Sequence, residues 1–321
     1  MKKKRDLLSL TDLAPKEIWD IFALAKRLKK ELKNKGGNKP LLKGKSLALI
    51  FEKQSLRTRI SFEIGMFQLG GYTVYLDPRD TGIGVRESEA DIAKVLSGMA
   101  DIIAARTYSH QTIVNIAKNS TIPVINALSD LEHPCQALTD LFTIWSCKAG
   151  SRSAGEMRLL KGLTIAYVGD GENNVAHSLC LGAAMMGMTF RSASPKGFWM
   201  NKNIAKTALS EVEGQAEILE TENPEEAVKG ADVVYTDTWI SMGDEQEKEK
   251  RLTIFKPYQV NQKLMKLAKK DAIFMHDLPA YRGNEVAADV IDGPQSVVFQ
   301  QAENRLHVQK ALLVKLPTLP K

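Results

Sequence analysis

The sequence is poor in cysteine, in aromatic residues and in long apolar runs. Three cysteines, Cys135, Cys147 and Cys180, occur in 321 residues, with no CxxC pair and no metal-ligand spacing. This scarcity is typical of proteins of the reducing cytoplasm. No apolar run approaches the roughly 20 residues that span a bilayer, and the N-terminus lacks the apolar stretch of a signal peptide. We therefore expect a cytoplasmic protein with no metal and no membrane partner.

Neither the basic nor the acidic residues are gathered into one long block of the sequence. Lysine and arginine number 44 against 38 aspartates and glutamates, for a net charge of +6, and the largest basic cluster is the short run 1–5. Aromatic residues make up 7% of the chain and form no stacking pattern among the basic residues. Nothing therefore indicates a nucleic-acid partner, whereas a mild positive bias suits a small anionic substrate.

What the sequence does contain is an alternation of strand-like and helix-like segments. Its length predicts about two domains. In the first half, strands are predicted over 46–51, 73–76, 102–106 and 123–126, and helices over 60–69, 87–98 and 111–119. This alternation is typical of a parallel sheet with helices on both faces.

A small, polar stretch at 148–155 interrupts the pattern, which then restarts. Strands are predicted over 163–168, 189–193, 233–236 and 272–275, and a last helix over 304–316. We predict an α/β protein of two doubly wound parallel-sheet domains, over 1–148 and 149–303, with a cleft between them. The C-terminal helix, within 304–321, is predicted to pack back on the first domain. Ligands of such sheets sit at the carboxyl ends of the strands.

The turn after the first predicted strand carries the strongest binding signal. Ser55, Leu56, Arg57, Thr58 and Arg59 lie between that strand and a helix. A helix N-terminus offers N–H groups and a positive dipole end, to which the hydroxyls and guanidiniums add further donors. The turn is therefore a candidate receptor for a phosphate or another small anion. A serine cap followed by solvated arginines is the competing interpretation.

A glycine-rich turn, Gly-Asp-Gly-Glu-Asn-Asn at 169–174, follows the first strand of the second half. It lacks the third glycine of a dinucleotide-binding fingerprint, because Asn174 stands there, and no acidic residue closes the next strand. An NAD-dependent dehydrogenase is therefore a weak alternative. A tight turn would explain the glycines alone, whereas the amides of Asn173 and Asn174 suit an amino-acid or amide ligand.

Polar side chains also mark two further element ends of the first half. Arg106 ends a strand, where it either points toward the ligand region or is simply solvated. His133 precedes a proline at the first position of a predicted helix, and with Gln136 it could polarise a carbonyl oxygen. Cys135 fits the core better than the role of a nucleophile.

The second half has similar element ends. Asp237 follows a strand and could bind an ammonium, and Ser241 could bind a carboxylate. The charged run 245–251 is predicted to be a mobile, solvated loop that could serve as a lid. His276 and Asp277 follow another strand, but no GxSxG elbow supports a hydrolase triad. Arg305 stands before the last predicted helix.

Taken in order, these motifs resemble those of the aspartate/ornithine carbamoyltransferase family, and its ornithine branch most closely. The family's Ser-Thr-Arg-Thr-Arg corresponds to 55–59, its arginine after a strand to Arg106, and its His-Pro-x-Gln to 133–136. Its Gly-Asp-Gly-Asn-Asn, Asp-x-Trp-x-Ser-Met-Gly, His-Cys-Leu-Pro and Ala-Glu-Asn-Arg correspond to 169–174, 237–243, 276–279 and 302–305. The motif at 237–243 marks the ornithine branch.

The resemblance implies transfer of the carbamoyl group of carbamoyl phosphate to the δ-amine of L-ornithine, giving L-citrulline and phosphate in arginine biosynthesis. It implies no cofactor and no metal. It also implies a carbamoyl-phosphate domain followed by an ornithine domain, and a homotrimer or a multiple of trimers.

The resemblance further implies a set of site residues. Those for carbamoyl phosphate are Ser55, Leu56, Arg57, Thr58, Arg106, His133, Gln136, Asp277, Leu278 and Arg305. Those for ornithine are Leu128, Asn174, Asp237, Ser241 and Met242. The residues that it implies to be catalytic are Arg106, His133, Asp237 and Asp277.

Four residues depart from the family pattern. Leu56 replaces a threonine and removes a hydroxyl. Gly82 stands where many relatives have a glutamine that reaches a neighbouring subunit's ligand, and Glu172 is an insertion. Asp277 replaces the cysteine beside the reacting amine, where it would either stabilise the charged ammonium or accept its proton.

These departures leave two further alternatives, a carbamoyltransferase for a different amine or modified ornithine, and a non-catalytic regulatory homologue. Asp237, Ser241 and Met242 favour an α-amino acid over a plain diamine. The site arginines and His133 argue against a decayed site, because clustered like charges are costly to keep.

Overall fold

The computed structural model describes residues 4–77, 82–83, 86–148, 160–211, 216–240 and 245–318. The chain divides into two compact units, which we describe separately. Unit 1 comprises Met1–Thr139 and Glu303–Lys321, and unit 2 comprises Asp140–Ala302. The two divisions fall inside helices α6 (Pro134–Lys148) and α13 (Val298–Lys315).

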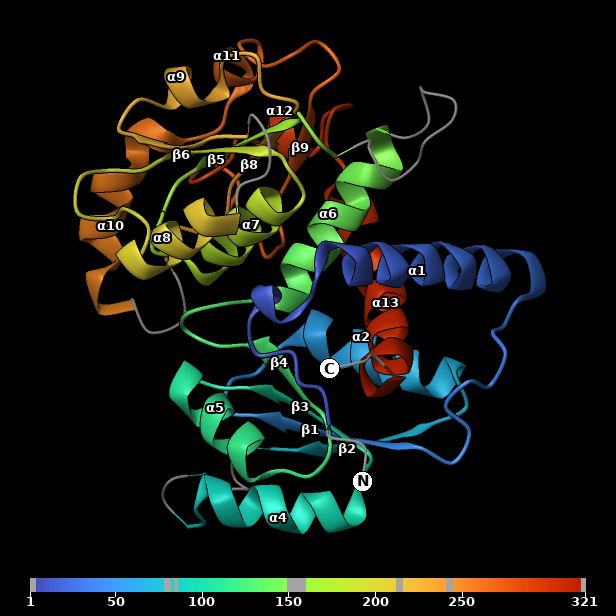
Figure 1. The fold of residues 1–321 in the computed structure, drawn as a ribbon. Helices are drawn as coiled ribbons and strands as arrows, with labels where there is room; N and C mark the ends of the chain where they lie inside the picture. The colour runs from blue at the N-terminus through green and yellow to red at the C-terminus, as the bar shows by residue number, and fades with distance from the viewer. Residues whose placement is uncertain are drawn as a thin grey trace. The chain divides into compact units, whose positions relative to one another are not determined.

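Unit 1 is built on a sheet of four parallel strands in the order β2-β1-β3-β4 (Figure 1). The strands are β1 (Ser46–Phe51), β2 (Tyr72–Leu76), β3 (Ile102–Arg106) and β4 (Val124–Leu128). The strands β1 and β3 are buried almost end to end, as expected for apolar runs covered on both faces. The edge strand β2 is half exposed.

Helices cover both faces of this sheet. Figure 1 shows α4 and α5 on one face, with α2 and α13 on the other. The helical elements of unit 1 are η1 (Leu10–Asp12), α1 (Pro15–Lys35), α2 (Leu56–Gln68), α4 (Glu89–Met99), α5 (His110–Asn119), the start of α6, most of α13, and η6 (Leu316–Thr318). Within unit 1, Lys310 of α13 donates to Gln68 of α2 at 2.7 Å, which confirms that the C-terminal helix packs on the first domain.

Unit 2 is built on five parallel strands in the order β7-β6-β5-β8-β9. They are β5 (Thr164–Val168), β6 (Thr189–Ala193), β7 (Ile218–Thr221), β8 (Val233–Tyr235) and β9 (Ile273–Met275). The helical elements are the rest of α6, α7 (Asn174–Met185), α8 (Lys202–Glu211), α9 (Pro224–Val228), η4 (Glu245–Glu247), α10 (Lys248–Phe255), η5 (Lys256–Tyr258), α11 (Gln262–Met265), α12 (Ala288–Ile291) and the start of α13. Figure 1 shows α7 and α8 on one face of the sheet, with α9, α11 and α12 on the other.

The predicted α/β architecture of two parallel sheets is confirmed, and each predicted strand is found within two residues of its expected bounds. Strand β7 was missed, because Ile218–Thr221 is a short edge strand without an apolar run. The helix predicted from residue 60 begins at Leu56, because Ser55 caps it, and the last helix begins at Val298 rather than at residue 304. The prediction of a solvated loop over 245–251 is wrong, since this segment forms η4 and the first half of α10.

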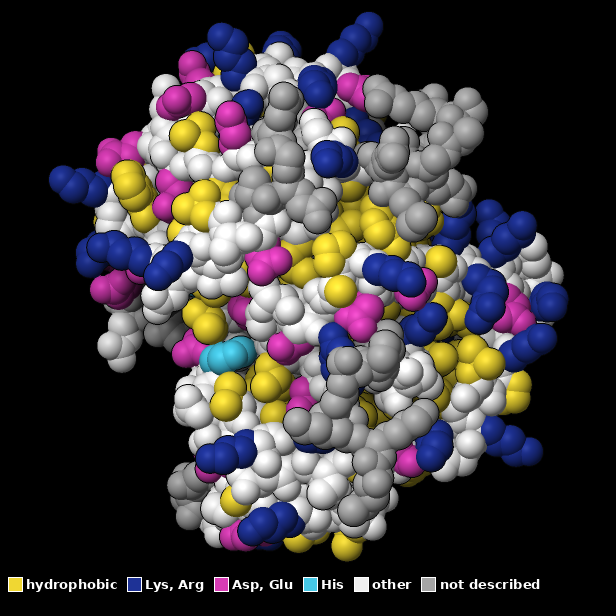
Figure 2. Space-filling model, in the orientation of Figure 1, with side chains coloured by type: hydrophobic (Ala, Val, Ile, Leu, Met, Phe, Trp, Pro, Cys, Tyr) yellow, Lys and Arg dark blue, Asp and Glu magenta, His cyan; other side chains and the backbone are white. Residues whose placement is uncertain are grey.

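Two general expectations about partners can also be compared with the structure. On the face shown in Figure 2, Lys and Arg side chains are spread among Asp and Glu rather than gathered in one patch. Among the described helices, none is both long enough and apolar enough to cross a membrane. The crossing predicted at 148–155 lies, from residue 149 on, outside the described residues.

Each sheet contains one point where the chain order reverses. In unit 1 it lies between β1 and β3, and in unit 2 between β5 and β8. The loops that leave two neighbouring strands at such a point diverge to opposite faces of the sheet and open a crevice at the strands' carboxyl ends, where α/β proteins bind their ligands. Most of the predicted site residues follow these strands.

Candidate active site

In unit 1, the reversal point is flanked by the helix start after β1. Ser55 is the N-cap of α2, and its hydroxyl accepts from the N–H of Thr58 at 3.4 Å. Leu56, Arg57 and Thr58 therefore form the first turn of the helix, where N–H groups have no intrahelical acceptor. The structure thus shows the serine cap, and this cap presents the remaining donors of the first turn together.

The loop after β1 is tied to the loop after β3 by Glu52. The N–H of Glu52 donates to the carbonyl of Arg106 at 2.8 Å, and its carboxylate accepts from the N–H of Tyr108 at 2.6 Å. These bonds hold the two sides of the reversal point in register. Sequence reasoning missed Glu52, whose only signal was a carboxylate directly after a buried strand.

Arg106 is the last residue of β3, in register with Phe51 and Leu128 on either side. It is 7% exposed, so the interpretation as a solvated strand end is wrong. Leu128, the last residue of β4, lies at the same edge of the sheet. The parallel register thus brings Arg106 and Leu128 to the edge where α2 begins.

His133 lies in the loop between β4 and α6, and hydrogen bonds fix the backbone around this loop. The amide of Asn126 donates to the carbonyl of Leu8 at 2.9 Å, and the N–H of Ser129 donates to the carbonyl of Glu132 at 2.9 Å. His133 itself is buried, and its carbonyl accepts from Gln136 at 3.0 Å as α6 begins at Pro134. The predicted helix start at His133-Pro134 is confirmed.

Cys135 is a core residue, as predicted. It is 1% exposed, and burial raises the pKa of its thiol to about 12. A thiol that stays protonated is a poor nucleophile, so Cys135 does not act as one.

Arg305 joins this group from α13. Its guanidinium donates to the hydroxyl of Thr58 at 2.6 Å. Unit 1 thus buries a polar set of five residues, each no more than 7% exposed: Thr58, Arg106, His133, Gln136 and Arg305. Guanidiniums stay charged when buried, and their forked donors match phosphate and carboxylate oxygens, so a small anion is the ligand that suits this set.

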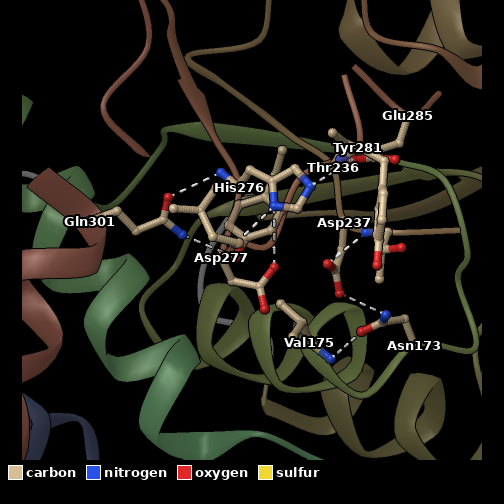
Figure 3. Close-up of polar contacts among 12 residues, drawn as sticks. Asn173, Val175, Thr236, Asp237, His276, Asp277, Tyr281, Glu285 and Gln301 are labelled. Carbon is tan, nitrogen blue, oxygen red and sulfur yellow. Dashed lines mark hydrogen bonds and ion pairs between the residues drawn. The ribbon is translucent and has the colours of Figure 1, made fainter. Parts of the chain in front are cut away.

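In unit 2, the reversal point is flanked by the turn 169–174 and by Asp237. A Cβ on Gly171 would lie 2.7 Å from the carbonyl oxygen of Phe198, so this close approach requires glycine. Asn173 caps α7 by accepting from the N–H of Val175 at 2.7 Å, and its amide donates to Asp237 at 2.8 Å (Figure 3). The side chain that bridges the reversal point is therefore Asn173, whereas the predicted Asn174 is the first residue of α7.

Asp237 is a buried carboxyl in unusual surroundings. One oxygen accepts from Asn173, and the other accepts from the N–H of Thr238 at 2.6 Å. Burial, and then the neighbouring charge of Asp277, raises the pKa of Asp237 well above its ordinary value. A carboxyl with a raised pKa is a better proton acceptor than an ordinary carboxylate.

His276, after β9, lies between two carboxylates. Its Nε2 is 3.3 Å from Glu285 and its Nδ1 is 3.5 Å from Asp277 (Figure 3). Burial opposes the charged ring, but hydrogen bonds to Asp277 and Glu285 outweigh it and raise the pKa of His276 to about 9. The N–H of Leu278 also lies 2.9 Å from Nδ1, and it can donate to the ring only while this nitrogen is unprotonated.

The strand end that carries His276 is anchored by a buried network. The N–H of His276 donates to the side-chain oxygen of Gln301 at 3.0 Å, and the Gln301 amide donates to Asp140 at 2.7 Å. The hydroxyl of Tyr235 donates to the same carboxylate at 3.1 Å. No sequence signal pointed to this network, because its members lie far apart in the chain.

Within the described residues, Asp237, His276 and Asp277 are the group that could hold a metal ion, with one atom from each lying within 4.8 Å of the others. Both oxygens of Asp237 already accept hydrogen bonds, and both ring nitrogens of His276 have partners within unit 2. Because these donor atoms are engaged within the protein, we assign no metal to the group.

The remaining predicted residues fall as follows. Ser241 and Met242 lie outside the described residues. Leu56 is 69% exposed, and Glu172 is exposed in the turn before α7. Gly82 has φ +52°, and a Cβ there would meet the Cβ of Arg86 at 2.7 Å, so the local backbone requires glycine at this departure from the family pattern.

Comparison with known proteins adds to this geometry. The family model described as the carbamoyl-P binding domain of aspartate/ornithine carbamoyltransferase matches residues 5–146, and the one described as the Asp/Orn binding domain matches residues 161–316. Ornithine carbamoyltransferase from Caldicellulosiruptor saccharolyticus is 52% identical over 311 residues, covering 97% of each chain. That from Bacillus subtilis is 50% identical over 310 residues, covering 96% of this chain and 92% of the relative.

The structure is similar to that of ornithine carbamoyltransferase from Pyrococcus furiosus, with a TM-score of 0.92 at 47% identity, covering 100% of this chain and 99% of that one. The fold and the two strand edges define a two-domain α/β protein, with a candidate anion site in unit 1 and a buried carboxyl group in unit 2. The chain belongs to the aspartate/ornithine carbamoyltransferase family.

Proposed function

We propose that this protein is an enzyme that transfers the carbamoyl group of carbamoyl phosphate to the δ-amine of L-ornithine, giving L-citrulline and phosphate, a step of arginine biosynthesis. The observation that carries the proposal is the similarity, near 50% identity and almost end to end, to proteins named ornithine carbamoyltransferase. The buried arginines of unit 1 and the carboxyl Asp237 of unit 2 support it, because the substrates carry a phosphate and two amines.

Unit 1 holds carbamoyl phosphate in this proposal. The phosphate lies at the start of α2, on Ser55, Thr58, the N–H of Leu56 and the guanidinium of Arg57. The carbonyl oxygen of carbamoyl phosphate lies toward Arg106, His133 and Gln136. Arg305 completes the site.

Unit 2 holds ornithine and the proton acceptor. Asp237 binds the δ-amine, and Asn174, Ser241 and Met242 hold the α-amino acid end. By the family resemblance, Leu128 is assigned to the same ligand. The backbone of Asp277 and Leu278 contributes to the carbamoyl site.

The reaction follows from these placements. The neutral δ-amine attacks the carbonyl carbon, a C–N bond forms, and a tetrahedral oxyanion develops next to Thr58, Arg106 and His133, whose donors stabilise it. The C–O bond to phosphate then breaks, and Arg57 with the start of α2 stabilises the departing phosphate. The proton released by the amine passes to Asp237. Holding two substrates in line supplies much of the remaining rate enhancement.

Asp277 acts with Asp237 as part of the proton acceptor in this proposal. Its carboxylate lies 3.5 Å from Nδ1 of His276, which at neutral pH is charged and so offsets the negative charge of Asp277. A carboxylate whose charge is offset by His276 stabilises the ammonium of ornithine less than an isolated carboxylate would. This favours the role of Asp277 as a proton acceptor over a role in stabilising the charged ammonium.

The protein is a homotrimer in this proposal. The outer face of α2 carries four exposed apolar side chains, Leu56, Ile60, Ile64 and Phe67, at 69%, 49%, 41% and 77% exposure. Their spacing places them along one side of the helix. An apolar stripe of this kind on a surface is typical of a subunit interface, and a second copy of this chain is the partner we propose for it.

The enzyme is cytoplasmic in this proposal, which its three free cysteines support.

One assay tests the function. The protein is mixed with carbamoyl phosphate and a panel of amines that includes ornithine, lysine, putrescine and acylated ornithine, and the ureido products are measured. Citrulline as the main product is expected. Turnover of another amine without turnover of ornithine would favour the alternative raised by Asp277, a carbamoyltransferase for a different amine, and no product with any amine would indicate a non-catalytic homologue.

A further inference from the structure

Arg251 connects the two segments of unit 2 that flank the reversal point of the sheet. It lies on α10 and is 5% exposed. Its Nε donates to the carbonyl oxygen of Trp239 at 2.6 Å, and its Nη2 forms an ion pair with Asp170. Asp170 belongs to the turn after β5, and Trp239 to the segment after β8. One guanidinium therefore holds both segments.

This guanidinium also lies over two aromatic rings. Its Cζ lies 5.0 Å from the ring centroid of Phe198 and 5.3 Å from that of Phe255. The side chains of Arg251 and Asp170 are 6% and 7% exposed. A buried charge is costly unless it is paired and hydrogen-bonded. The planar guanidinium of arginine can donate to two acceptors while it stacks on aromatic rings, which the ammonium group of lysine cannot do.

The contacts of Arg251 close a ring of interactions that includes Asp237, which is proposed to bind ornithine. Asp170 accepts from the N–H of Glu172 at 3.0 Å, and its carbonyl accepts from the N–H of Asn173 at 3.3 Å. The Asn173 amide donates to Asp237, which stands two residues before Trp239. Arg251, the turn 170–173, Asp237 and Trp239 therefore hold one another in a single arrangement.

Trp239 is held at two points in this ring. Its indole ring stacks on Phe255 with centroids 5.9 Å apart, and its carbonyl accepts from Arg251. Asp237 stands two residues before it and accepts from Asn173. A fixed Trp239 therefore helps to hold Asp237 in the position in which it is proposed to bind ornithine.

We propose that Arg251 is a positioning residue for the amino-acid substrate, which sets the affinity for ornithine by holding Asp170 and Trp239 together without touching the substrate. This rests on the proposed function. Loss of Arg251 releases the turn 170–173 and the segment after β8 from each other, so ornithine binding weakens. Carbamoyl phosphate binding is preserved, because most of its proposed residues, among them Ser55–Thr58, Arg106 and Arg305, lie in unit 1.

The test compares Arg251→Gln, Arg251→Lys and the control Lys250→Gln, whose side chain is adjacent on α10 and 64% exposed. The KM values of both substrates are measured. The dissociation constant of norvaline, which is ornithine without its δ-amine, is measured by calorimetry with carbamoyl phosphate bound. For Arg251→Gln we expect the ornithine KM and the norvaline dissociation constant to rise about 10- to 100-fold, with the carbamoyl phosphate KM within about twofold of wild type. Arg251→Lys should recover part of the loss, and Lys250→Gln should behave as wild type.

Arg251→Gln leaves Asp170 buried without its cation, which by itself lowers stability. The double variant Asp170→Asn/Arg251→Gln removes both charges and keeps a polar side chain at each position, so it carries the test if the single variant does not fold. A folded variant, single or double, with ornithine KM and norvaline binding near wild type would overturn the proposal, and so would an equal rise in both KM values. Absence of citrulline from the wild type would refute the proposed function instead, and norvaline binding would still test Arg251.

Discussion

The guanidinium of Arg305 donates to the hydroxyl of Thr58 at 2.6 Å, which joins two residues 247 positions apart in the chain. Thr58 is fully buried in the first turn of α2, and Arg305 is 3% exposed on α13. The bond places a guanidinium at the N-terminus of a helix, where the helix dipole and the side chains of the first turn already favour an anion.

The first prediction concerns this bond. Thr58→Val keeps the shape of the side chain and removes its hydroxyl, so Arg305 loses a buried acceptor. We expect the free energy of unfolding to fall by about 1 kcal/mol and the KM for carbamoyl phosphate to rise about tenfold, with little change in the KM for ornithine. Thr253→Val, which removes an exposed hydroxyl on α10, is the control. An unchanged KM for carbamoyl phosphate would mean that the Thr58 hydroxyl does not serve the anion site.

The second prediction concerns the charge of Asp277. A carboxylate near an amine stabilises its protonated form and so raises its pKa, and removal of the carboxylate lowers that pKa. In Asp277→Asn and Asp277→Cys we therefore expect the acidic limb of the pH profile of kcat/KM for ornithine to move about one unit lower. We also expect kcat to fall in Asp277→Asn, because part of the proton acceptor is lost. Asp271→Asn, which removes an exposed charge, is the control. The same pH profile in wild type and variants would show that Asp277 does not act on the amine.

The third prediction concerns stability and pH. The pKa of His276 is about 9 in the folded protein against an ordinary value of 6.5. Because the folded state holds the proton more tightly, the stabilisation is complete below about pH 6.5 and is lost as the pH rises through about 9. The difference in melting temperature between wild type and His276→Gln should therefore shrink over this range.

His307→Gln is the control for this measurement. Burial lowers the pKa of His307 to about 4, so its contribution changes between about pH 4 and 6.5 and is constant above that range. A difference between wild type and His276→Gln that does not vary from pH 6.5 to 9 would contradict a charged His276 in the folded protein.

The fourth prediction concerns the apolar stripe of α2. Phe67 is 77% exposed, and Phe67→Glu places a charge in the proposed interface between copies of the chain. We expect this variant to sediment as a monomer at concentrations where the wild type is a trimer, because a buried unpaired charge is costly. Leu209→Glu, at a position 59% exposed on α8 of unit 2, should remain trimeric. A trimer of unchanged stability in Phe67→Glu would place the interface elsewhere.

Local pattern was enough to predict most of the fold. The strands β1 and β3 are short apolar runs with polar residues at both ends, so their bounds could be read from the sequence alone. Strand β7 carries no such run, because an edge strand need not be buried on both sides, and it was missed. The segment 245–251 was wrongly taken for a solvated loop, because all seven of its residues are charged or polar, although the side chain of Arg251 is buried.

Much of the candidate site could also be predicted, for a definite reason. Ligands of parallel sheets bind at strand ends, so residues such as Arg106, His133 and Asp237 can be identified as candidates because they follow apolar runs. What could not be predicted is how these ends are held. Glu52, Asp170 and Arg251 act through partners that sequence spacing does not reveal.

The sequence by itself determined which chemical groups stand at each strand end, because the order of apolar runs and turns is a local property of the chain. Tertiary structure alone decided which of these groups meet. Strand order put Asn173 against Asp237, and the return of α13 brought Arg305 to Thr58. Burial then decided their ionisation, raising the pKa of Asp237 while letting His276 keep its proton between two carboxylates. These outcomes depend on distance and on exclusion of water, and neither exists until the chain has folded.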